Sequence, residues 1–379
     1  MRGDPTGLDA IQGGHKFQSI FSFVDFPMHT NVLLYYFTGT GNSHRAAQWM
    51  ASTARQAGLT AQVTPINAAN PASEIKPGAL LGLLYPAHGF TAPWAILRFA
   101  LALPPGRGVQ AFTAMPRGAL KLGRLYLPGM EGSGNYLVGL ILWLKGYQLR
   151  GAIGLDMPGS WTALLPGLPP EAVTAMLTRM QPRVQSFMGD LLAGRTRFES
   201  IIEGLLGLLL LPLSFMYLIM GRFFLAKMFY ASARCNGCGL CAQNCPVRGV
   251  VMKRDRPYWT FLCESCTRCM NYCPQQAVEA SYPFGALIAY LASLPVSAFV
   301  LDGLARAGLH AAGWQSPVLA WIIDYPYKLL ALALGYGILA LLLRVRWFNT
   351  LLTTLTPTRY YRRYHEPGTR LKDISGKQK

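Results

Sequence analysis

The distribution of the cysteines constrains this chain more than any other feature. All eight cysteines lie between Cys235 and Cys273, in two copies of the pattern C-x2-C-x2-C-x3-C-P. Because every cysteine belongs to this pattern, none is left for a structural disulfide, which suits a reducing compartment. The first copy comprises Cys235, Cys238, Cys241 and Cys245, and the second comprises Cys263, Cys266, Cys269 and Cys273.

The spacing within each copy predicts iron–sulfur ligation. Three thiolates two residues apart can surround one corner of a cubane cluster, while the fourth, set off by three residues and followed by proline, reaches the other cluster. We therefore expect two 4Fe-4S clusters. The first would be held by Cys235, Cys238, Cys241 and Cys273, and the second by Cys263, Cys266, Cys269 and Cys245.

Zinc is the alternative metal, since C-x2-C pairs also build zinc ribbons. Zinc sites use two close pairs separated by a loop, rather than four cysteines that end in proline, so the pattern favours iron–sulfur. Residues 230 to 281 resemble the two-cluster bacterial ferredoxins. That resemblance implies low-potential transfer of single electrons, without bond chemistry on a substrate, and residues 231–282 are the expected ferredoxin domain.

A second motif lies near the amino end. Residues 32–37 are typical of a buried parallel strand, and the turn that follows opens a helix. Such a turn cradles a phosphate, because its backbone approaches closely and the helix N-terminus supplies N–H donors. It resembles the FMN phosphate loop of flavodoxins, and it matches neither a P-loop nor a dinucleotide fingerprint. Its residues are Thr38, Gly39, Thr40, Gly41, Asn42 and Ser43.

Further strands are expected at residues 60–66, 80–85, 109–115 and 151–157, separated by helices such as 93–103 and 171–192. Five strands with crossovers fit a flavodoxin-like doubly wound parallel sheet, with strand order 2-1-3-4-5 and FMN at the carboxyl ends of its strands. Residues 31–195 are the expected FMN-binding domain.

In that fold, two loops would border the flavin ring. The loop after the third strand supplies Pro86, His88, Gly89 and Phe90, and residues 116–118 would border the other edge. Ordinary packing of His88, Phe90 and Trp94 remains an alternative, as does a sheet domain without flavin. Residues 31–281 together resemble a family of flavodoxin-like and bacterial-ferredoxin fusions, on the strength of the 37–43 turn, the 85–93 stretch and the eight cysteines. That resemblance implies electron transfer between partners that the family leaves undefined.

Three apolar segments lie outside these motifs, at residues 204–221, 284–301 and 329–343. Each is close to the minimum length of about 17 residues that a membrane-spanning helix needs. We expect an apolar interfacial or re-entrant helical linker over residues 196–230, because a span there would separate flavin from clusters. A hydrophobic helical hairpin is expected in the membrane over residues 283–346, and the alternative is a buried helical pair that covers the soluble domains.

The chain carries a formal charge of +18, and charged residues make up only 14% of it. This balance favours an anionic lipid membrane or an acidic redox protein as partner, whereas no nucleic-acid motif is present. Residues 347–379 form a basic tail that is either solvated or bound to lipid headgroups, as the positive-inside rule predicts for the cytoplasmic side. Residues 1–30 lack the pattern of a signal peptide and are expected to be a disordered extension.

The leading hypothesis is a membrane-associated electron-transfer protein at the cytoplasmic face of the inner (plasma) membrane. It would relay electrons between FMN and two 4Fe-4S clusters to a redox partner, and no residue is assigned a catalytic role. One alternative is a reductase of a quinone or small molecule, for which Asp302, His310 or Asp324 could donate protons. Another is a fixed electron-entry subunit of a larger membrane complex. An electron carrier is favoured over a stand-alone oxidoreductase.

Overall fold

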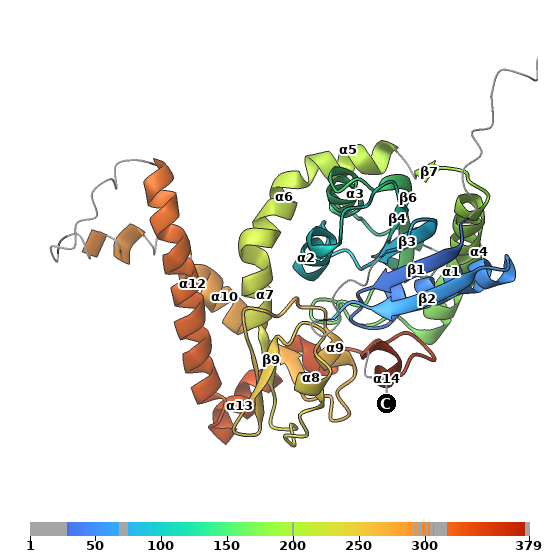
Figure 1. The fold of residues 1–379 in the computed structure, drawn as a ribbon. Coiled ribbons are helices and arrows are strands. Elements are labelled where there is room, and N and C mark those ends of the chain that lie inside the picture. The colour runs from blue at the N-terminus through green and yellow to red at the C-terminus, as the bar shows by residue number, and fades with distance from the viewer. Residues whose placement is uncertain are drawn as a thin grey trace, which may run out of the picture.

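The computed structural model describes residues 29–67, 75–123, 125–198, 201–291 and 317–375, and scattered positions between 293 and 306. A sheet domain, a small cysteine module below it and an arm of helices make up the described chain (Figure 1). The predicted disorder of residues 1–28, the proposed proton donor His310 and part of the 284–301 segment lie outside the described residues.

The sheet domain has the strand order β2-β1-β3-β4-β6-β7, and each of these neighbouring pairs is parallel. The strands span Asn31–Tyr36 (β1), Thr60–Pro65 (β2), Ala79–Leu84 (β3), Gln110–Leu122 (β4), Gln148–Pro158 (β6) and Arg197–Phe198 (β7). The short β5, Leu125–Leu127, pairs with β4 in the antiparallel sense. The predicted doubly wound parallel sheet is therefore confirmed, with β6 as its fifth strand.

Helices cover both faces of this sheet (Figure 1). One face carries α1 (Asn42–Gln56) and α4 (Pro170–Leu192), and the other carries α2 (Trp94–Ala102) and α3 (Gly134–Leu144). All six residues of β3 are buried, as expected for a central parallel strand that is covered on both faces. The sequence analysis missed α3, whose composition is nearly as apolar as that of a buried strand.

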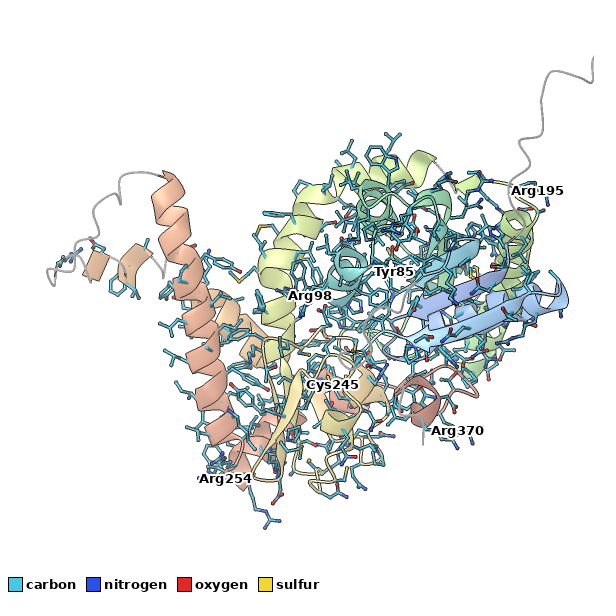
Figure 2. All side chains as sticks on the ribbon, viewed as in Figure 1. Tyr85, Arg98, Arg195, Cys245, Arg254 and Arg370 are labelled. Atoms are coloured by element: carbon cyan, nitrogen blue, oxygen red, sulfur yellow. The ribbon has the colours of Figure 1, made fainter. Side chains whose placement is uncertain are left out.

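The cysteine module consists of two small antiparallel sheets and two short helices. Strand β8 (Phe229–Ala231) pairs with β11 (Val278–Ala280), and β9 (Val250–Lys253) pairs with β10 (Arg256–Trp259). The helices α8 (Leu240–Gln243) and α9 (Arg268–Asn271) occupy equivalent places in the two copies of the cysteine motif. Figure 2 shows Cys245 in the interior of this module, whereas Arg254 reaches its outer edge.

The first apolar segment links the sheet domain to the cysteine module. It forms α5 (Ile201–Leu209), α6 (Leu211–Met216), the π turn η1 (Tyr217–Gly221) and α7 (Arg222–Lys227). One side packs on the sheet domain, where the Ser214 hydroxyl donates to the Phe90 carbonyl at 2.8 Å. The opposite side exposes a row of large apolar side chains: Leu205, Leu208, Leu209, Leu213 and Phe215. The segment therefore packs against protein on one side and leaves an apolar face on the other.

The two later apolar segments form α10 (Tyr282–Leu291) and α12 (Pro317–Leu342). Ten residues of helix extend roughly 15 Å, about half of the hydrocarbon core of a bilayer. In α12, residues 324–342 are long and apolar enough to cross a membrane, by length and composition only. The same helix packs on the cysteine module, where the Tyr336 hydroxyl donates to the Phe229 carbonyl at 2.8 Å. The hairpin thus covers that module at least in part, and its place in a membrane stays a prediction.

The carboxyl-terminal segment differs from the solvated or lipid-bound tail that the sequence suggested. It forms α13 (Arg346–Thr354), the 3-10 helix η2 (Pro357–Tyr360) and α14 (Leu371–Ile374), and it returns to the sheet domain (Figure 1). The Glu366 amide donates to the Thr40 carbonyl at 2.8 Å, and Ile374 joins the core of the sheet domain. Two buried acidic residues, Glu279 and Glu366, form ion pairs with arginines. These buried ion pairs help to hold the segment against the rest of the chain.

Candidate cofactor sites

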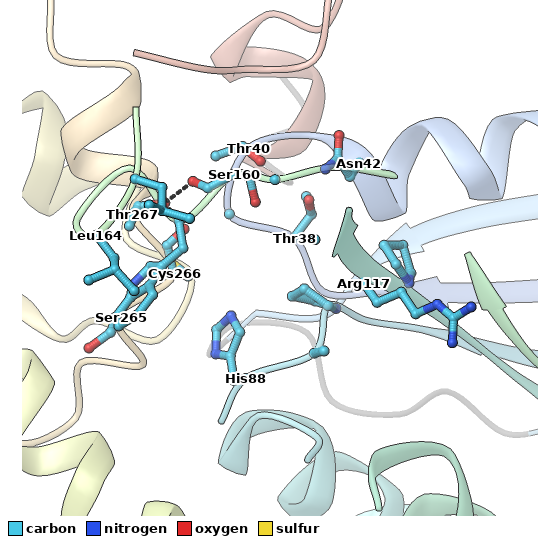
Figure 3. A pocket seen from close by; sticks show the side chains of 18 of the residues that line it. Thr38, Thr40, Asn42, His88, Arg117, Ser160, Leu164, Ser265, Cys266 and Thr267 are labelled. Carbon is cyan, nitrogen blue, oxygen red and sulfur yellow. Dashed lines mark hydrogen bonds between the residues drawn. The ribbon is translucent and has the colours of Figure 1, made fainter. Parts of the chain in front are cut away.

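A cavity of about 270 Å³ lies at the carboxyl ends of the parallel strands (Figure 3). This is where doubly wound sheets bind their ligands. The loops after β1, β3 and β6 and residues 116–118 and Leu120 of β4 line it, together with a loop of the cysteine module and Tyr217 and Leu225 of the linker. Most of the predicted flavin residues line it: Thr38, Gly39, Thr40, Asn42, Ser43, Pro86, His88 and Gly89. Gly41 and Phe90 do not.

The phosphate-type turn is built around Gly41, whose φ of 109° lies in the left-handed region that favours glycine. The Gly41 amide donates to the Thr38 hydroxyl at 2.9 Å, and the Gly41 carbonyl accepts from the Arg45 amide at 2.9 Å, which starts α1. The Ser43 hydroxyl is buried without a partner among the described residues. A phosphate at this helix N-terminus would supply that partner, so the turn fits FMN.

Asn42 connects the phosphate-type turn to two other parts of the chain. Its side-chain amide donates to the Pro158 carbonyl at 2.9 Å, and its oxygen accepts from the Tyr364 hydroxyl at 2.7 Å. The side chain therefore ties the turn to β6 and to the carboxyl-terminal segment. Asn42 thus orients the turn and also lines the cavity.

The loop after β3 places His88 at the cavity wall (Figure 3). Burial lowers the pKa of His88 to about 4, so its ring is neutral near pH 7. Its Nδ1 atom has no partner among the described residues, and the ring lies edge-on to Phe37 with centroids 6.4 Å apart. Phe90 was expected beside the flavin ring, but it lines a second cavity instead, because its positive φ of 61° reverses the chain after His88.

The cysteine module forms the opposite wall of the same cavity. Residues 264–267 line it, and the Thr267 hydroxyl donates to the Ser160 carbonyl at 3.0 Å, as Figure 3 shows. A Cβ atom added to Gly39 would lie 1.9 Å from the Cys266 carbonyl oxygen, so the phosphate-type turn and the second cysteine loop touch. The Glu264 carboxylate accepts from the amides of Trp94 and Ala95 at 3.2 Å each. Burial raises its pKa to about 7.

Arg268 joins the two loops, and the sequence analysis did not single it out. Its guanidinium donates to the Thr38 carbonyl at 2.6 Å, to the Gly39 carbonyl at 3.4 Å and to the Asn244 carbonyl at 3.0 Å. The side chain is almost fully buried. A planar guanidinium suits such a cluster of carbonyl oxygens, because it presents several donors in fixed directions. The only signal in the sequence is its position between two cysteines.

Two small cavities in the cysteine module are lined by cysteines, and each includes the four cysteines expected to bind one cluster. One is lined by Cys235, Cys238, Cys241 and Cys273, and by Cys269. The other is lined by Cys245, Cys263, Cys266 and Cys269, and by Cys241. Each cavity includes the cysteine expected from the opposite copy of the motif, Cys273 in the first and Cys245 in the second, while Cys241 and Cys269 border both cavities.

Several donors point at these sulfurs. The Gly249 amide donates to Cys245 Sγ at 3.1 Å, the Ala277 amide to Cys273 Sγ at 3.4 Å, and Trp259 Nε1 to Cys269 Sγ at 3.4 Å. Such donors stabilise the thiolates that an iron–sulfur cluster needs, so the donor set fits one. Without metal, burial raises the pKa of Cys241 and of Cys266 to about 11. Among the described residues, no three His, Cys, Asp or Glu side chains converge on a point that a single metal ion could occupy. The cluster ligands stay predictions.

Lys227 is a buried cation beside the second group of cysteines. Its ammonium lies over the rings of Phe261 at 4.4 Å and Tyr336 at 4.6 Å, and it donates to the Trp259 carbonyl. Burial lowers its pKa to about 8, while the nearby Cys263 acts in the opposite direction.

No protein-family model matches the sequence, and no curated protein matches it. Among solved structures, the chain is similar to a flavodoxin of Streptococcus pneumonia TIGR4, at 15% identity and a TM-score of 0.31, over 43% of this chain and 98% of the flavodoxin. It is also similar to a short-chain flavodoxin associated with a bacterial microcompartment, at 14% identity and a TM-score of 0.31, over 44% of this chain and 99% of that one.

A third similar structure is the rubredoxin oxygen:oxidoreductase of Desulfovibrio gigas, at 15% identity and a TM-score of 0.28, over 43% of this chain and 37% of that one. All of these scores are low. The flavodoxin-like assignment of the sheet domain therefore rests on its own strand order and on the cavity at the carboxyl ends of its strands.

Proposed function

We propose that this protein is an electron carrier that holds one FMN in the sheet domain and two 4Fe-4S clusters in the cysteine module. The observation that carries the proposal is the shared wall of the first cavity, where Cys266 and its neighbours face the phosphate-type turn. FMN exchanges electrons in pairs or singly, whereas each cluster exchanges one at a time. A contact between the two sites is what such a relay requires.

The residues around the cavity bind and orient the flavin. The hydroxyls of Thr38, Thr40 and Ser43 and the first amides of α1 would hold the phosphate. Neutral His88 borders the ring without adding a charge to it. Leu164 and Leu165 line the cavity, are about half exposed, and would shield a bound flavin from water.

Arg268 fixes the position of the proposed flavin site relative to the second group of cysteines. Because its guanidinium bonds to carbonyls of the phosphate-type turn and lies between Thr267 and Cys269, a shift of one loop would move the other. A fixed relation of this kind suits electron transfer, which needs the two sites at constant separation. In this proposal Arg268 is a positioning residue.

The cofactor content tests the proposal directly. Full-length protein purified anaerobically in detergent should contain about eight irons, matching acid-labile sulfide and one FMN per chain. Reduction by dithionite should give the EPR spectrum of two interacting 4Fe-4S clusters. Zinc in place of iron would overturn the cluster half, and a full iron content without flavin would overturn the relay.

A pair of glycine variants tests the contact between the sites. Gly39→Ala places a methyl group against the Cys266 carbonyl, so the turn must separate from the cysteine loop. We expect it to lower FMN content at least tenfold and to slow electron transfer from FMN to the clusters. Gly189→Ala, at a helix position with open space around it, is the matched control and should behave as wild type. Normal FMN affinity in Gly39→Ala would contradict the proposed contact.

We further propose that the protein works at the cytoplasmic surface of an anionic membrane, where it meets its redox protein partner. The exposed apolar face of α5 and α6 and the excess of basic residues support this location. In vesicle flotation, Leu209→Glu should weaken binding to anionic liposomes. Leu125→Glu, an equally drastic change at an exposed leucine of β5, should not. Equal flotation of all three proteins would argue against this surface.

A further inference from the structure

A second cavity, of about 500 Å³, lies between the π turn η1 and helix α12. This volume is in the range of small-molecule sites. Its walls are mostly apolar and come from α6, the π turn, α7, α10 and α12, including Met220, Phe224, Ile288 and Leu332. The Tyr325 hydroxyl donates to the Ile219 carbonyl at 2.7 Å, which joins α12 to the π turn beside the cavity. Single π turns inside helices occur often at functional sites.

One ion pair interrupts this apolar lining. Asp324 Oδ2 lies 2.5 Å from Lys328 Nζ, and both residues line the cavity. Asp324 is only 5% exposed, and its other oxygen, Oδ1, has no hydrogen-bond partner among the described residues. A buried carboxylate oxygen without a donor is costly, so a ligand hydroxyl would stabilise it. The Lys328 ammonium has three N–H donors. The ion pair with Asp324 does not use all of them, so a donor is left for a ligand.

The second cavity adjoins the first. Gly89 and Tyr217 line both of them, and a Cβ atom added to Gly89 would lie 2.2 Å from the Tyr217 ring. A ligand in the second cavity is therefore separated from the proposed flavin site by the Tyr217 side chain and the loop that carries Gly89. This proximity is useful to a ligand that exchanges electrons.

The mouth of the cavity is apolar. Leu213 and Met216 line the cavity and are also about half exposed, at 50% and 51%. Leu330 and Leu334 expose similar fractions on α12, outside the lining. A ligand with a long hydrocarbon tail could leave this tail among these side chains.

We propose that the second cavity binds the headgroup of a lipophilic quinone. Lys328 donates to a carbonyl of the oxidised ring, and Asp324 Oδ1 accepts from a hydroxyl of the reduced ring, so both oxidation states find a partner. The apolar walls hold the ring, and the tail leaves past Leu213 and Met216. This inference rests on the proposed function, since a redox ligand needs a redox centre beside it.

Binding to the full-length protein, loaded with its cofactors in detergent, tests the site. The probes are decylubiquinone for equilibrium binding and an azido-substituted quinone for photolabelling, with the labelled peptide located by mass spectrometry. We expect labelling within residues 213–225 or 324–332. Decylbenzene, which has the tail and a ring but no carbonyl oxygens, should compete at least tenfold less well than decylubiquinone.

Two variants and two matched controls sharpen this test. Ala289→Trp adds a large side chain at an exposed lining position of α10, and Ala286→Trp places the same side chain on that helix outside the lining. Asp324→Asn removes the buried charge, and Asp190→Asn does the same to the ion pair of Asp190 with Arg195, which lies outside the lining. Both cavity variants should weaken quinone binding at least tenfold, and both controls less than twofold.

Unchanged affinity in Ala289→Trp, labelling at other residues, or equal competition by decylbenzene would overturn the quinone site. Cofactor content is measured on the same samples. If iron and FMN are present and quinone fails to bind, the inference fails while the proposed relay stands. If quinone binds as expected but FMN is absent, the relay fails and the binding site remains.

Discussion

The two halves of the cysteine module carry the same motif in different surroundings. In the first group Cys238 is exposed, and none of its four cysteines lines the first cavity. In the second group Cys263 is buried, Cys266 lines the first cavity, and Lys227 lies nearby. The repeat thus yields one group that borders the first cavity and one that does not. In the proposed relay, the second cluster exchanges electrons with FMN and the first with an external partner.

Replacing one cysteine in each group should separate the proposed roles of the two clusters. We expect these replacements to change electron-transfer rates more than any other substitution discussed below. Cys266→Ser should abolish the second cluster and slow electron transfer between FMN and the module at least about a hundredfold, an effect of ~2.7 kcal/mol or more. Cys238→Ser should leave that step intact and block transfer to an external acceptor. Stopped-flow absorbance of flavin and clusters distinguishes the two steps. If both variants slow the same step, the assigned order of the clusters is wrong.

Loss of Arg268 should weaken the flavin site without removing a ligand. In Arg268→Met the carbonyls of Thr38 and Gly39 lose a buried charged donor, which costs about 1–3 kcal/mol for each unsatisfied group. We expect FMN to bind at least tenfold more weakly, as measured by flavin fluorescence during titration of the apoprotein. Arg254→Met, at the outer edge of the first half of the module (Figure 2), is the control. Unchanged FMN affinity in Arg268→Met would show that the second half of the cysteine module contributes no more to FMN binding than the first half does.

On the sheet domain's side of the contact with the cysteine module, His88 should make the free energy of unfolding depend on pH. The pKa of His88 is about 4 in the folded protein and near 6.5 in the unfolded chain, so the unfolded chain binds more protons between these values. Stability is therefore fully present above pH 6.5 and falls as the pH drops towards 4, by at most about 3 kcal/mol. Denaturant melts at several pH values, compared with those of His88→Gln, measure the difference. Parallel curves for the two proteins would contradict a buried neutral His88.

The smallest expected effect concerns the reduction potentials. Lys227 places a positive charge near Cys263, and a cation favours the more negative, reduced cluster. Lys227→Met should lower the potential of the second cluster by on the order of 50–100 mV, and that of the first cluster by much less. A redox titration followed by EPR resolves the two clusters. Equal shifts of both potentials would mean that Lys227 does not distinguish them.

Patterns within short stretches of sequence were sufficient for much of this architecture. The alternation of apolar strands and helical segments predicted the parallel order, and residues 38–43, 86–90 and 116–118 together predicted much of the cavity lining on the sheet side. These features follow from neighbouring residues, because a strand, a turn and a helix start are set by local spacing and side-chain type. The prediction was less successful for Phe90, since a positive φ within a loop has no periodic signal.

The sequence by itself determined the doubly wound sheet and the phosphate-type turn. Only the tertiary structure decided that Cys266 faces the turn, that Arg268 spans the contact, and that the basic carboxyl-terminal segment closes over Thr40. Arg268 and Thr38 are 230 residues apart in the chain. Contacts at such separations depend on how folded elements pack together and provide hydrogen-bond partners for one another's buried polar groups. No pattern within a short stretch of sequence encodes that packing.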